Sequence, residues 1–186
     1  MKICITGGIG SGKSYICKLL KMRGINVYDC DTAAKKLIQT SNTIRQQLID
    51  LIGPDVYIDN QFNKEALTKF LLKNDGNNKA VNNIIHPEVL YDFENSGMEW
   101  MESAILFESG FDKFVDYVVI VTAPEELRIQ RVIQRNNISR EKVLQWMQHQ
   151  WPQEKIRQLA DYEIINDGIL NIDSQLDKLL NNINKL

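Results

Sequence analysis

The sequence GGIGSGKS, at Gly7–Ser14, decides the fold of this 186-residue chain. It matches GxxxxGK[ST] at every required position, and it lies between the apolar run Lys2–Thr6 and a helical pattern that stops at Gly24. In that context the glycines let backbone N–H groups wrap around phosphates, and the helix N-terminus adds a positive dipole. The motif therefore predicts a nucleoside triphosphate site, although it does not identify the acceptor of a phosphoryl group.

Two side chains of this phosphate-binding loop (P-loop) carry chemistry of their own. Lys13 can reach the β- and γ-phosphates, and the Ser14 hydroxyl can ligate Mg²⁺. The cofactors expected from the motif are a nucleoside triphosphate, for which we predict ATP, and Mg²⁺.

Five short apolar runs predict strands, and helical patterns separate them. Most runs are rich in Val, Ile and Tyr and are apolar at consecutive positions, which is typical of strands buried on both faces of a parallel sheet. The runs are Lys2–Thr6, Asn26–Asp29, Ala104–Phe107, Tyr117–Thr122 and Tyr162–Ile165. We therefore predict an α/β P-loop fold, with a five-stranded parallel sheet flanked by helices.

The helical patterns are bounded by recognisable caps and breaks. Ser41 is expected to cap a helix that stops at Gly53, and Asn63 one that continues to Leu72. A further helix over Asn77–Ile85 is expected to be interrupted at His86-Pro87. The remaining helices are expected over 12–23, 125–136, 140–149 and 153–160, and around Leu176–Ile183.

The spacing of the strands predicts two helical insertions in a single domain over 1–186. The stretch 33–101 is far too long for one crossover, so we expect a helical subdomain there, over one end of the sheet. The segment 124–160 is a second helical excursion, and we expect it to form a lid.

Charge is unevenly distributed along the chain. The formal net charge is −2, but residues 128–157 hold seven basic and two acidic side chains, a net charge of +5. This window contains five of the seven arginines, and Arg128, Arg131 and Arg135 form one helical stripe. Such a stripe repels itself unless an anion faces it, so with the P-loop it favours a small polyphosphate ligand over nucleic acid.

Other classes of P-loop protein fit the chain less well. Asn63–Ala66 starts like the guanine-reading NKxD but lacks the Asp, and the DxxG match at Asp50–Gly53 closes a helix. The apolar run Tyr117–Thr122 ends without the acidic residue that is usual in transport or mechanical ATPases. A small kinase with an arginine-rich lid explains more of the sequence.

Targeting and metal-binding signals are weak. No apolar run approaches the roughly 18 residues that a membrane helix needs, and the N-terminus does not resemble a signal peptide. Three cysteines without a CxxC pair and two distant histidines argue against a zinc site. We therefore expect a cytoplasmic protein with no membrane partner.

Asp29-Cys30-Asp31 ends the second predicted strand. If that strand neighbours the first, two carboxylates lie near the γ-phosphate, where one can deprotonate an acceptor hydroxyl and the other can hold Mg²⁺ through water. The alternative is that the pair only caps the next helix, through Asp31 and Thr32. Glu108, at the end of the third predicted strand, is a similar candidate.

Taken in order along the chain, these motifs resemble the dephospho-coenzyme A kinase family. The resemblance covers Thr6–Ser14, Asp29–Asp31 with Ala34, His86-Pro87, Ile105–Glu108, Arg131, Arg135, Arg140, Gln150, Ala160-Asp161 and Asn166–Gly168. It implies transfer of the γ-phosphoryl group of ATP to the ribose 3′-hydroxyl of dephospho-coenzyme A, the last step of coenzyme A biosynthesis.

The resemblance also implies roles for individual residues. Asp31 would be the catalytic base, and Lys13 and Arg140 would stabilise the phosphoryl group in transfer. The acceptor would be bound by Thr6, Asp29, Asp31, Lys35, His86 and Glu108. ATP would be bound by Gly8, Ile9, Gly10, Ser11, Gly12, Lys13, Ser14, Tyr15, Arg135, Asn166 and Gly168.

Some positions depart from the family pattern. Cys30 stands where Ala is usual, Lys35 where Arg is usual, and Gln153 where an arginine is common, which leaves the role of Arg157 open. None of these changes removes a group that the chemistry requires.

Two alternative functions remain at this point. One is a kinase for a nucleoside monophosphate or another small alcohol on the same fold, although the carboxylates Asp29 and Asp31 would repel a phosphate acceptor. The other is a P-loop regulatory or binding module with slow turnover, which would have no need of a base or a lid.

Overall fold

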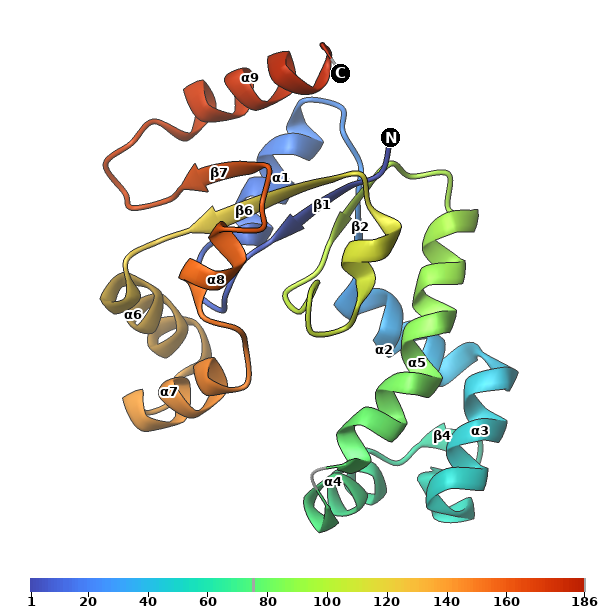
Figure 1. The fold of residues 1–186 in the computed structure, drawn as a ribbon. Coiled ribbons are helices and arrows are strands. Elements are labelled where there is room, and N and C mark those ends of the chain that lie inside the picture. The colour runs from blue at the N-terminus through green and yellow to red at the C-terminus, as the bar shows by residue number, and fades with distance from the viewer. Residues whose placement is uncertain (75, 186) are drawn as a thin grey trace. The chain divides into compact units, whose positions relative to one another are not determined.

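The computed structural model describes residues 1–74 and 76–185. The chain forms two compact units (Figure 1). The first contains Met1–Tyr28 and the chain from Met98 onward, and the second contains Asp29–Gly97. Within the described residues, no helix is both long enough and apolar enough to cross a membrane.

A five-stranded parallel sheet organises the first unit and confirms the predicted fold. The strand order is β2 (Val27–Asp29), β5 (Trp100–Glu102), β1 (Ile3–Thr6), β6 (Tyr117–Thr122) and β7 (Tyr162–Ile165). β1 pairs in parallel with both β5 and β6 and is buried along its whole length. A strand buried on both faces has no polar alternation, which is why its sequence is continuously apolar.

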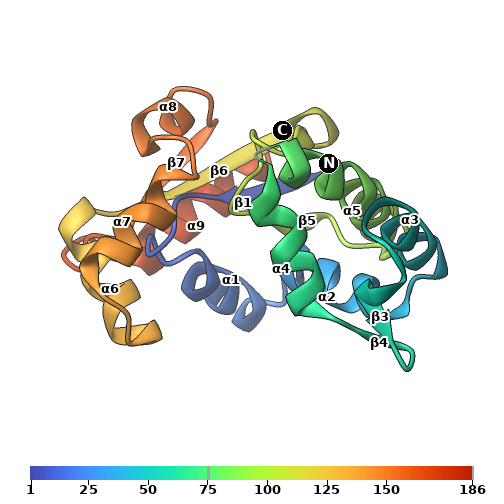
Figure 2. The same cartoon turned by 90° about the horizontal axis from the view of Figure 1, so that it is seen from below.

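Helices cover both faces of this sheet. α1 (Lys13–Met22) and α9 (Ile172–Ile183) pack on one face, where Ile16, Leu20 and Leu176 join the main apolar core. Figure 2 shows α8 (Gln153–Arg157) on the opposite side of β6 from α1. Burial of each such aliphatic side chain contributes roughly 1.5–3 kcal/mol, so this core holds the loop between β1 and α1 in place.

Two further helices, α6 (Glu125–Asn136) and α7 (Arg140–Gln148), form a smaller core of their own. It contains Ile129, Val132 and Val143, and the partly buried Ile9 of the P-loop packs against it. The apex of the P-loop is therefore anchored in these helices by an apolar side chain.

The second unit is mainly helical. It contains α2 (Cys30–Thr40), α3 (Asn42–Ile52), a 3₁₀ turn at Pro54–Val56, the hairpin of β3 (Tyr57–Ile58) and β4 (Gln61–Phe62), α4 (Lys64–Lys73) and α5 (Gly76–Asn95). Ser41 and Asn63 cap α3 and α4, as predicted. The hairpin was not expected, and Asp59 and Asn60 adopt positive φ in its two-residue turn, which Asp and Asn tolerate well.

The third predicted strand is wrong, because the observed strand lies earlier in the chain. Ala104–Phe107 lies in a turn, and the strand is Trp100–Glu102. The sheet pairing ends where Ser103 N donates to Ile5 O, and Leu106 is then buried from a turn. A buried turn and a buried strand both produce an apolar run, so composition cannot separate them.

The predicted break at His86-Pro87 is also wrong. α5 continues through Pro87 to Asn95. Val81, Ile85 and Val89 recur at helical spacing on both sides of the proline and are buried. Their packing outweighs the one backbone hydrogen bond that proline removes.

Candidate nucleotide-binding site

The P-loop joins β1 to α1 and is closely packed from outside. Gly12 adopts φ of 98° at the N-cap of α1, a left-handed conformation that favours glycine. A Cβ atom there would collide with the Asn166 side chain, and one at Gly8 would collide with the Arg128 guanidinium. The glycine pattern therefore follows from these neighbours as well as from room for phosphates.

Lys13 is folded back over the loop. Its side chain is 8% exposed, and Nζ donates to Gly7 O at 2.8 Å. Ser14 and Tyr15 follow in the first turn of α1 and are exposed. The ammonium group is thus held at the loop, and the Ser14 hydroxyl lies at the exposed N-terminus of the helix.

Asn166 ties the end of β7 to the P-loop. Its Nδ2 donates to Ser11 O at 2.8 Å, and its backbone N donates to Thr122 O at 2.8 Å. Arg131 Nη2 donates to Asn166 O at 3.0 Å. Asn166 is therefore buried against the loop from Ser11 to Gly12.

The loop that follows Asn166 is turned by Asp167 and Gly168. Asp167 Oδ1 accepts from Ile169 N and Leu170 N, at 2.8 and 2.9 Å, and these backbone bonds lower the pKa of that carboxyl. Gly168 adopts φ of 83°, and the space around its Cα is open. This loop therefore exposes its backbone beside the residue that contacts the P-loop.

The arginines of the α6 stripe differ in burial and in hydrogen-bond partners. Arg128 is 6% exposed, and its Nε donates to Ile9 O at 3.0 Å. Burial lowers its pKa, although nearby Glu125 acts in the opposite direction. Arg135 is exposed, and its Nε donates to Oδ1 of the neighbouring Asn136 at 2.9 Å. A backbone carbonyl of the P-loop thus takes one N–H of the Arg128 guanidinium, and the stripe as an anion-binding surface stays a prediction.

Arg140 is exposed at the start of α7 and forms an ion pair with Glu126. Its Nη1 donates to Glu126 Oε2 at 2.8 Å, and its Nη2 donates to Glu126 Oε1. The hydrogen bonds from Arg140 lower the pKa of Glu126, and the same bonds raise the pKa of Arg140. A guanidinium that holds a carboxylate through two hydrogen bonds can hold a phosphate in the same way.

Three buried side-chain oxygens near the carboxyl ends of β1 and β5 stand out. Within the described part of the chain, Thr6 Oγ1, Ser11 Oγ and Glu108 Oε2 are buried without a hydrogen-bond partner. The second oxygen of Glu108, Oε1, accepts from Trp151 N at 2.7 Å. Buried polar atoms without partners are costly, and they are typical of sites that a ligand completes.

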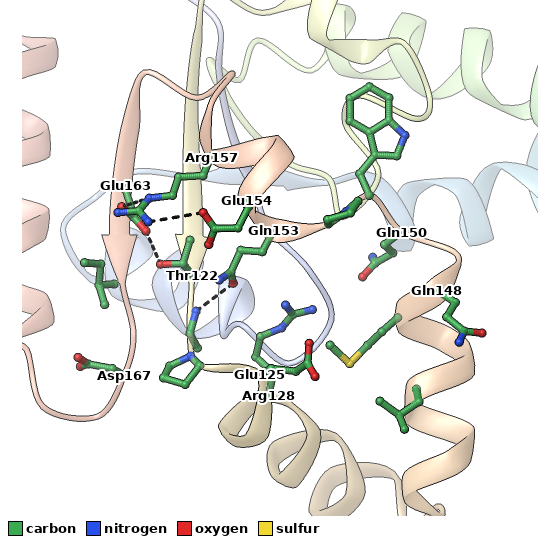
Figure 3. A pocket seen from close by; sticks show the side chains of 17 residues that line it. Thr122, Glu125, Arg128, Gln148, Gln150, Gln153, Glu154, Arg157, Glu163 and Asp167 are labelled. Carbon is green, nitrogen blue, oxygen red and sulfur yellow. Dashed lines mark hydrogen bonds and ion pairs between the residues drawn. The ribbon is translucent and has the colours of Figure 1, made fainter.

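A cleft of about 890 Å³ lies at the ends of β6 and β7, beside α7 and α8 (Figure 3). Some of its polar lining residues are paired with one another. Arg157 Nε contacts Glu163 Oε2 at 2.8 Å, and Gln153 Oε1 accepts from Ala123 N at 3.2 Å. Gln153 therefore supports the backbone at the position where the family commonly has arginine, and the exposed Arg157 pairs with acidic neighbours.

The remaining expected site residues belong to the second unit. Asp29 caps α2, since Oδ1 accepts from Thr32 N at 2.9 Å and Oδ2 accepts from Thr32 Oγ1 at 2.7 Å. Asp31 is exposed in the first turn, and Lys35 lies one turn later on the same face. β5 lies between β2 and β1, so the second strand does not neighbour the first as the sequence argument required.

His86 lies in α5 and is half-buried. This burial lowers the pKa of its imidazole. At neutral pH the neutral ring is therefore the favoured form, which can both donate and accept a hydrogen bond.

Two side chains that hold the P-loop from outside, those of Arg128 and Gln150, were not predicted in this role. Arg128 was expected to face an anion, and Gln150 had no role beyond the resemblance, yet its Oε1 accepts from Ile9 N at 2.8 Å. Gln150 is far from Ile9 in the sequence and shows no local pattern. Only its place in the family motif could have drawn attention to it.

Comparisons with known proteins agree on one family. The family described as dephospho-CoA kinase matches residues 1–171. A dephospho-CoA kinase of Bacteroides fragilis is 40% identical, over 97% of this chain and 91% of the relative. One of Salinibacter ruber is 37% identical, over 90% and 89%. A protein of known crystal structure from Thermus thermophilus is 31% identical, with a TM-score of 0.83, over 97% of this chain and 95% of that one.

More distant solved structures share the fold alone. A shikimate kinase from Acinetobacter baumannii has a TM-score of 0.55 at 17% identity. The family match covers nearly the whole chain, and the structure has a P-loop on a five-stranded parallel sheet. This chain belongs to the dephospho-CoA kinase family.

Proposed function

We propose that this protein transfers the γ-phosphoryl group of ATP to the ribose 3′-hydroxyl of dephospho-coenzyme A, which gives coenzyme A and ADP. The observation that carries the proposal is the family match over residues 1–171, on a chain whose P-loop is fully formed. In the reaction, the 3′-oxygen forms a bond to the γ-phosphorus, the bond from that phosphorus to the β,γ-bridging oxygen breaks, and the 3′-proton passes to a base.

The nucleotide is assigned to the P-loop and its neighbours. The phosphates are assigned to backbone N–H groups of the loop between Gly8 and Ser14, except those of Ile9 and Ser11, which donate to Gln150 Oε1 and Gly8 O. Arg135, which is exposed, is assigned to the phosphates. Asn166 and Gly168 are assigned to the adenine side, where the open backbone around Gly168 supports a flat ligand.

Magnesium is expected to arrive with the nucleotide. Among residues 1–74 and 76–185, no three carboxylate, histidine or cysteine side chains gather into a metal site. The donors that fit are phosphate oxygens with the exposed Ser14 hydroxyl, and oxygen donors suit Mg²⁺. Asp29 or Asp31 could contact it through water. When bound, Mg²⁺ neutralises part of the phosphate charge.

Lys13 and Arg140 are assigned to the charge of the phosphoryl group in transfer. Lys13 Nζ already lies at the P-loop, on Gly7 O. Arg140 would leave Glu126 for the phosphoryl oxygens, within a lid formed by 124–160. Exclusion of water by that lid would prevent wasteful hydrolysis of ATP.

Asp31 is assigned as the base on the 3′-hydroxyl. Sequence reasoning alone did not rank it against Asp29. Both carboxylate oxygens of Asp29 are taken by Thr32, whereas Asp31 has no hydrogen-bond partner among the described residues. A carboxylate without a partner is available to accept a proton, which supports Asp31.

The acceptor substrate is assigned to the helical unit, within 33–101, and to the end of β5. Lys35, on the same face of α2 as Asp31, supplies a positive charge for an anionic substrate, and His86 can hydrogen-bond in its neutral form. Glu108 Oε2 and Thr6 Oγ1 are buried and unsatisfied in the described structure, which supports their use by substrate or bound water.

The direct test is turnover of defined acceptors. Purified protein with ATP and Mg²⁺ is given dephospho-coenzyme A, AMP or shikimate in separate reactions, and product mass is measured. Coenzyme A is expected from the first reaction only. Phosphorylation of AMP or shikimate without coenzyme A would overturn the proposal, and ATP hydrolysis alone would favour a regulatory module.

The base is tested with a matched pair of carboxylate variants. Asp31→Asn should lower kcat by about a hundredfold or more, since general base catalysis contributes 10²–10⁴. Its Kd for ATP, measured by calorimetry, should stay near the wild-type value. Asp29→Asn retains an oxygen to cap α2 and should lower kcat much less than Asp31→Asn does. A slow Asp29→Asn beside a normal Asp31→Asn would assign the base to Asp29.

A further inference from the structure

Ile9, at the apex of the P-loop, is held through its side chain and both of its backbone polar groups. Its side chain packs against the small core of α6 and α7. Its carbonyl accepts from Arg128 Nε at 3.0 Å, and its N–H donates to Gln150 Oε1 at 2.8 Å. The peptide groups on both sides of Ile9 are therefore fixed by residues more than 100 positions away in the sequence.

Gln150 is itself oriented by the segment that follows β5. Its Nε2 donates to Ala104 O at 3.3 Å, while its Oε1 faces Ile9. An amide whose two ends have different partners has one preferred orientation, because a flip would oppose donor to donor and acceptor to acceptor. In Figure 3, Gln150 and Arg128 come from different elements, the turn after α7 and helix α6.

The turn that carries Gln150 is anchored at the next residue. Trp151 N donates to Glu108 Oε1 at 2.7 Å. The Trp151 ring stacks on Phe107, with centroids 5.7 Å apart, and Lys155 Nζ lies 3.2 Å from its centroid. Because these contacts fix the turn, the Gln150 amide cannot move away from Ile9 without breaking the contacts of Trp151 with Glu108 and Phe107.

We propose that Gln150 is a positioning residue for phosphoryl transfer. By taking the outward N–H of Ile9, it keeps the apical peptide of the P-loop in one plane, so that the N–H groups that follow are presented to the triphosphate. Arg128 does the same for the Ile9 carbonyl. The turn between α7 and α8 thereby sets the geometry of the P-loop from outside, without touching the substrate. This inference rests on the proposed kinase function.

The physical expectation is a loss of alignment more than a loss of nucleotide affinity. Phosphoryl transfer depends almost entirely on positioning and electrostatics, and a displacement of about 1 Å can cost a hundredfold in rate. ADP and ATP still contact many loop amides when one peptide tilts. The effect should therefore appear in kcat.

The test compares three variants of the full chain. Gln150→Met removes both hydrogen bonds at similar volume. Gln150→Glu keeps an oxygen for Ile9 N, but it loses the donor to Ala104 O and adds a negative charge. Gln148→Met is the matched control, since Gln148 is an exposed glutamine of the same helix end and lines the same cleft. kcat, KM for ATP, Kd for ADP and the thermal midpoint are measured for each.

Gln150→Met should lower kcat by about tenfold or more while Kd for ADP changes by less than about threefold. Gln150→Glu should restore kcat at saturating ATP to within about threefold of wild type, with KM for ATP raised by charge repulsion that added salt reduces. Gln148→Met should match wild type. Rescue of kcat by the acceptor oxygen is a result that loss of stability would not produce.

Equal kcat in Gln150→Met and Gln148→Met would overturn the proposal, as would a Gln150→Glu variant as slow as Gln150→Met. If Gln150→Met does not fold, the Gln150→Glu variant still decides, because a tenfold lower kcat there contradicts the role of the acceptor oxygen. Absence of coenzyme A from the wild-type protein would instead contradict the proposed function.

Discussion

The arginines at the two ends of the stretch from Arg128 to Arg140 lie in opposite environments. Arg128 and Arg131, both within α6, bond to backbone carbonyls of the P-loop and of Asn166. Arg135 and Arg140, beyond them, are exposed, and their side chains hydrogen-bond to Asn136 and Glu126. The difference shows that a basic cluster can be divided between holding a loop and meeting a ligand. Proximity to the unsatisfied carbonyls of the P-loop decides which arginines do which.

The largest effect is expected at the exposed end. Arg140→Ala should lower kcat by about a hundredfold or more, as is usual when a donor to a developing charge is removed. The free energy of unfolding, from urea titration, should not change measurably, because the Arg140–Glu126 pair is exposed. Arg157→Ala, another exposed and paired arginine, is the control and should turn over normally. An unchanged kcat in Arg140→Ala would remove the distinction between the two ends.

At the buried end the effect should fall on stability. Arg128→Ala leaves Ile9 O without its charged donor, and such bonds contribute about 1.5–3 kcal/mol, so the free energy of unfolding should fall by about 2 kcal/mol. Urea titration measures it, with Arg135→Ala as the exposed control. If the free energy of unfolding falls by the same amount in both variants, the buried contact of Arg128 does not stabilise the loop.

The smallest effect concerns the pH dependence of the exposed pair. The pKa of Glu126 in the folded chain is below its usual 4.5, so its stabilising contribution is present above that value and disappears as the pH falls through the folded pKa. The raised pKa of Arg140 has no consequence near neutrality, since the group is charged there in both states. Wild type should therefore have a slightly higher Tm than Glu126→Gln at about pH 7, and the difference should shrink as the pH falls below 4.5 and through the folded pKa. A difference that persists in acid would point to a contact other than the ion pair.

Much of the fold could be predicted where the pattern is local. The P-loop, the strands Tyr117–Thr122 and Tyr162–Ile165, and the caps Ser41 and Asn63 all follow from short-range preferences. The third strand and the uninterrupted α5 could not be predicted, because tertiary packing of Leu106 and of the residues around Pro87 overrides the local signal.

The candidate site divides in the same way. The chemistry of Lys13 and Ser14 is inherent in the motif, and a carboxylate pair at Asp29 and Asp31 is visible in the sequence. The sequence does not show which of the two carboxylates is the better candidate base, because Asp29 becomes a cap only when Thr32 enters a helix beside it. The lack of hydrogen-bond partners for Thr6 Oγ1 and Glu108 Oε2 likewise could not be predicted, because it depends on how these atoms are buried in the fold.

By itself, the sequence determined that a phosphate-binding loop joins the first strand to the first helix, because GxxxxGK[ST] depends on residues adjacent in the chain. Only the tertiary structure decided what holds that loop. Arg128, Gln150 and Asn166 reach it from segments far along the chain, and each completes backbone groups that the loop cannot satisfy internally. A buried peptide group must find a partner, and which residue supplies it depends on packing.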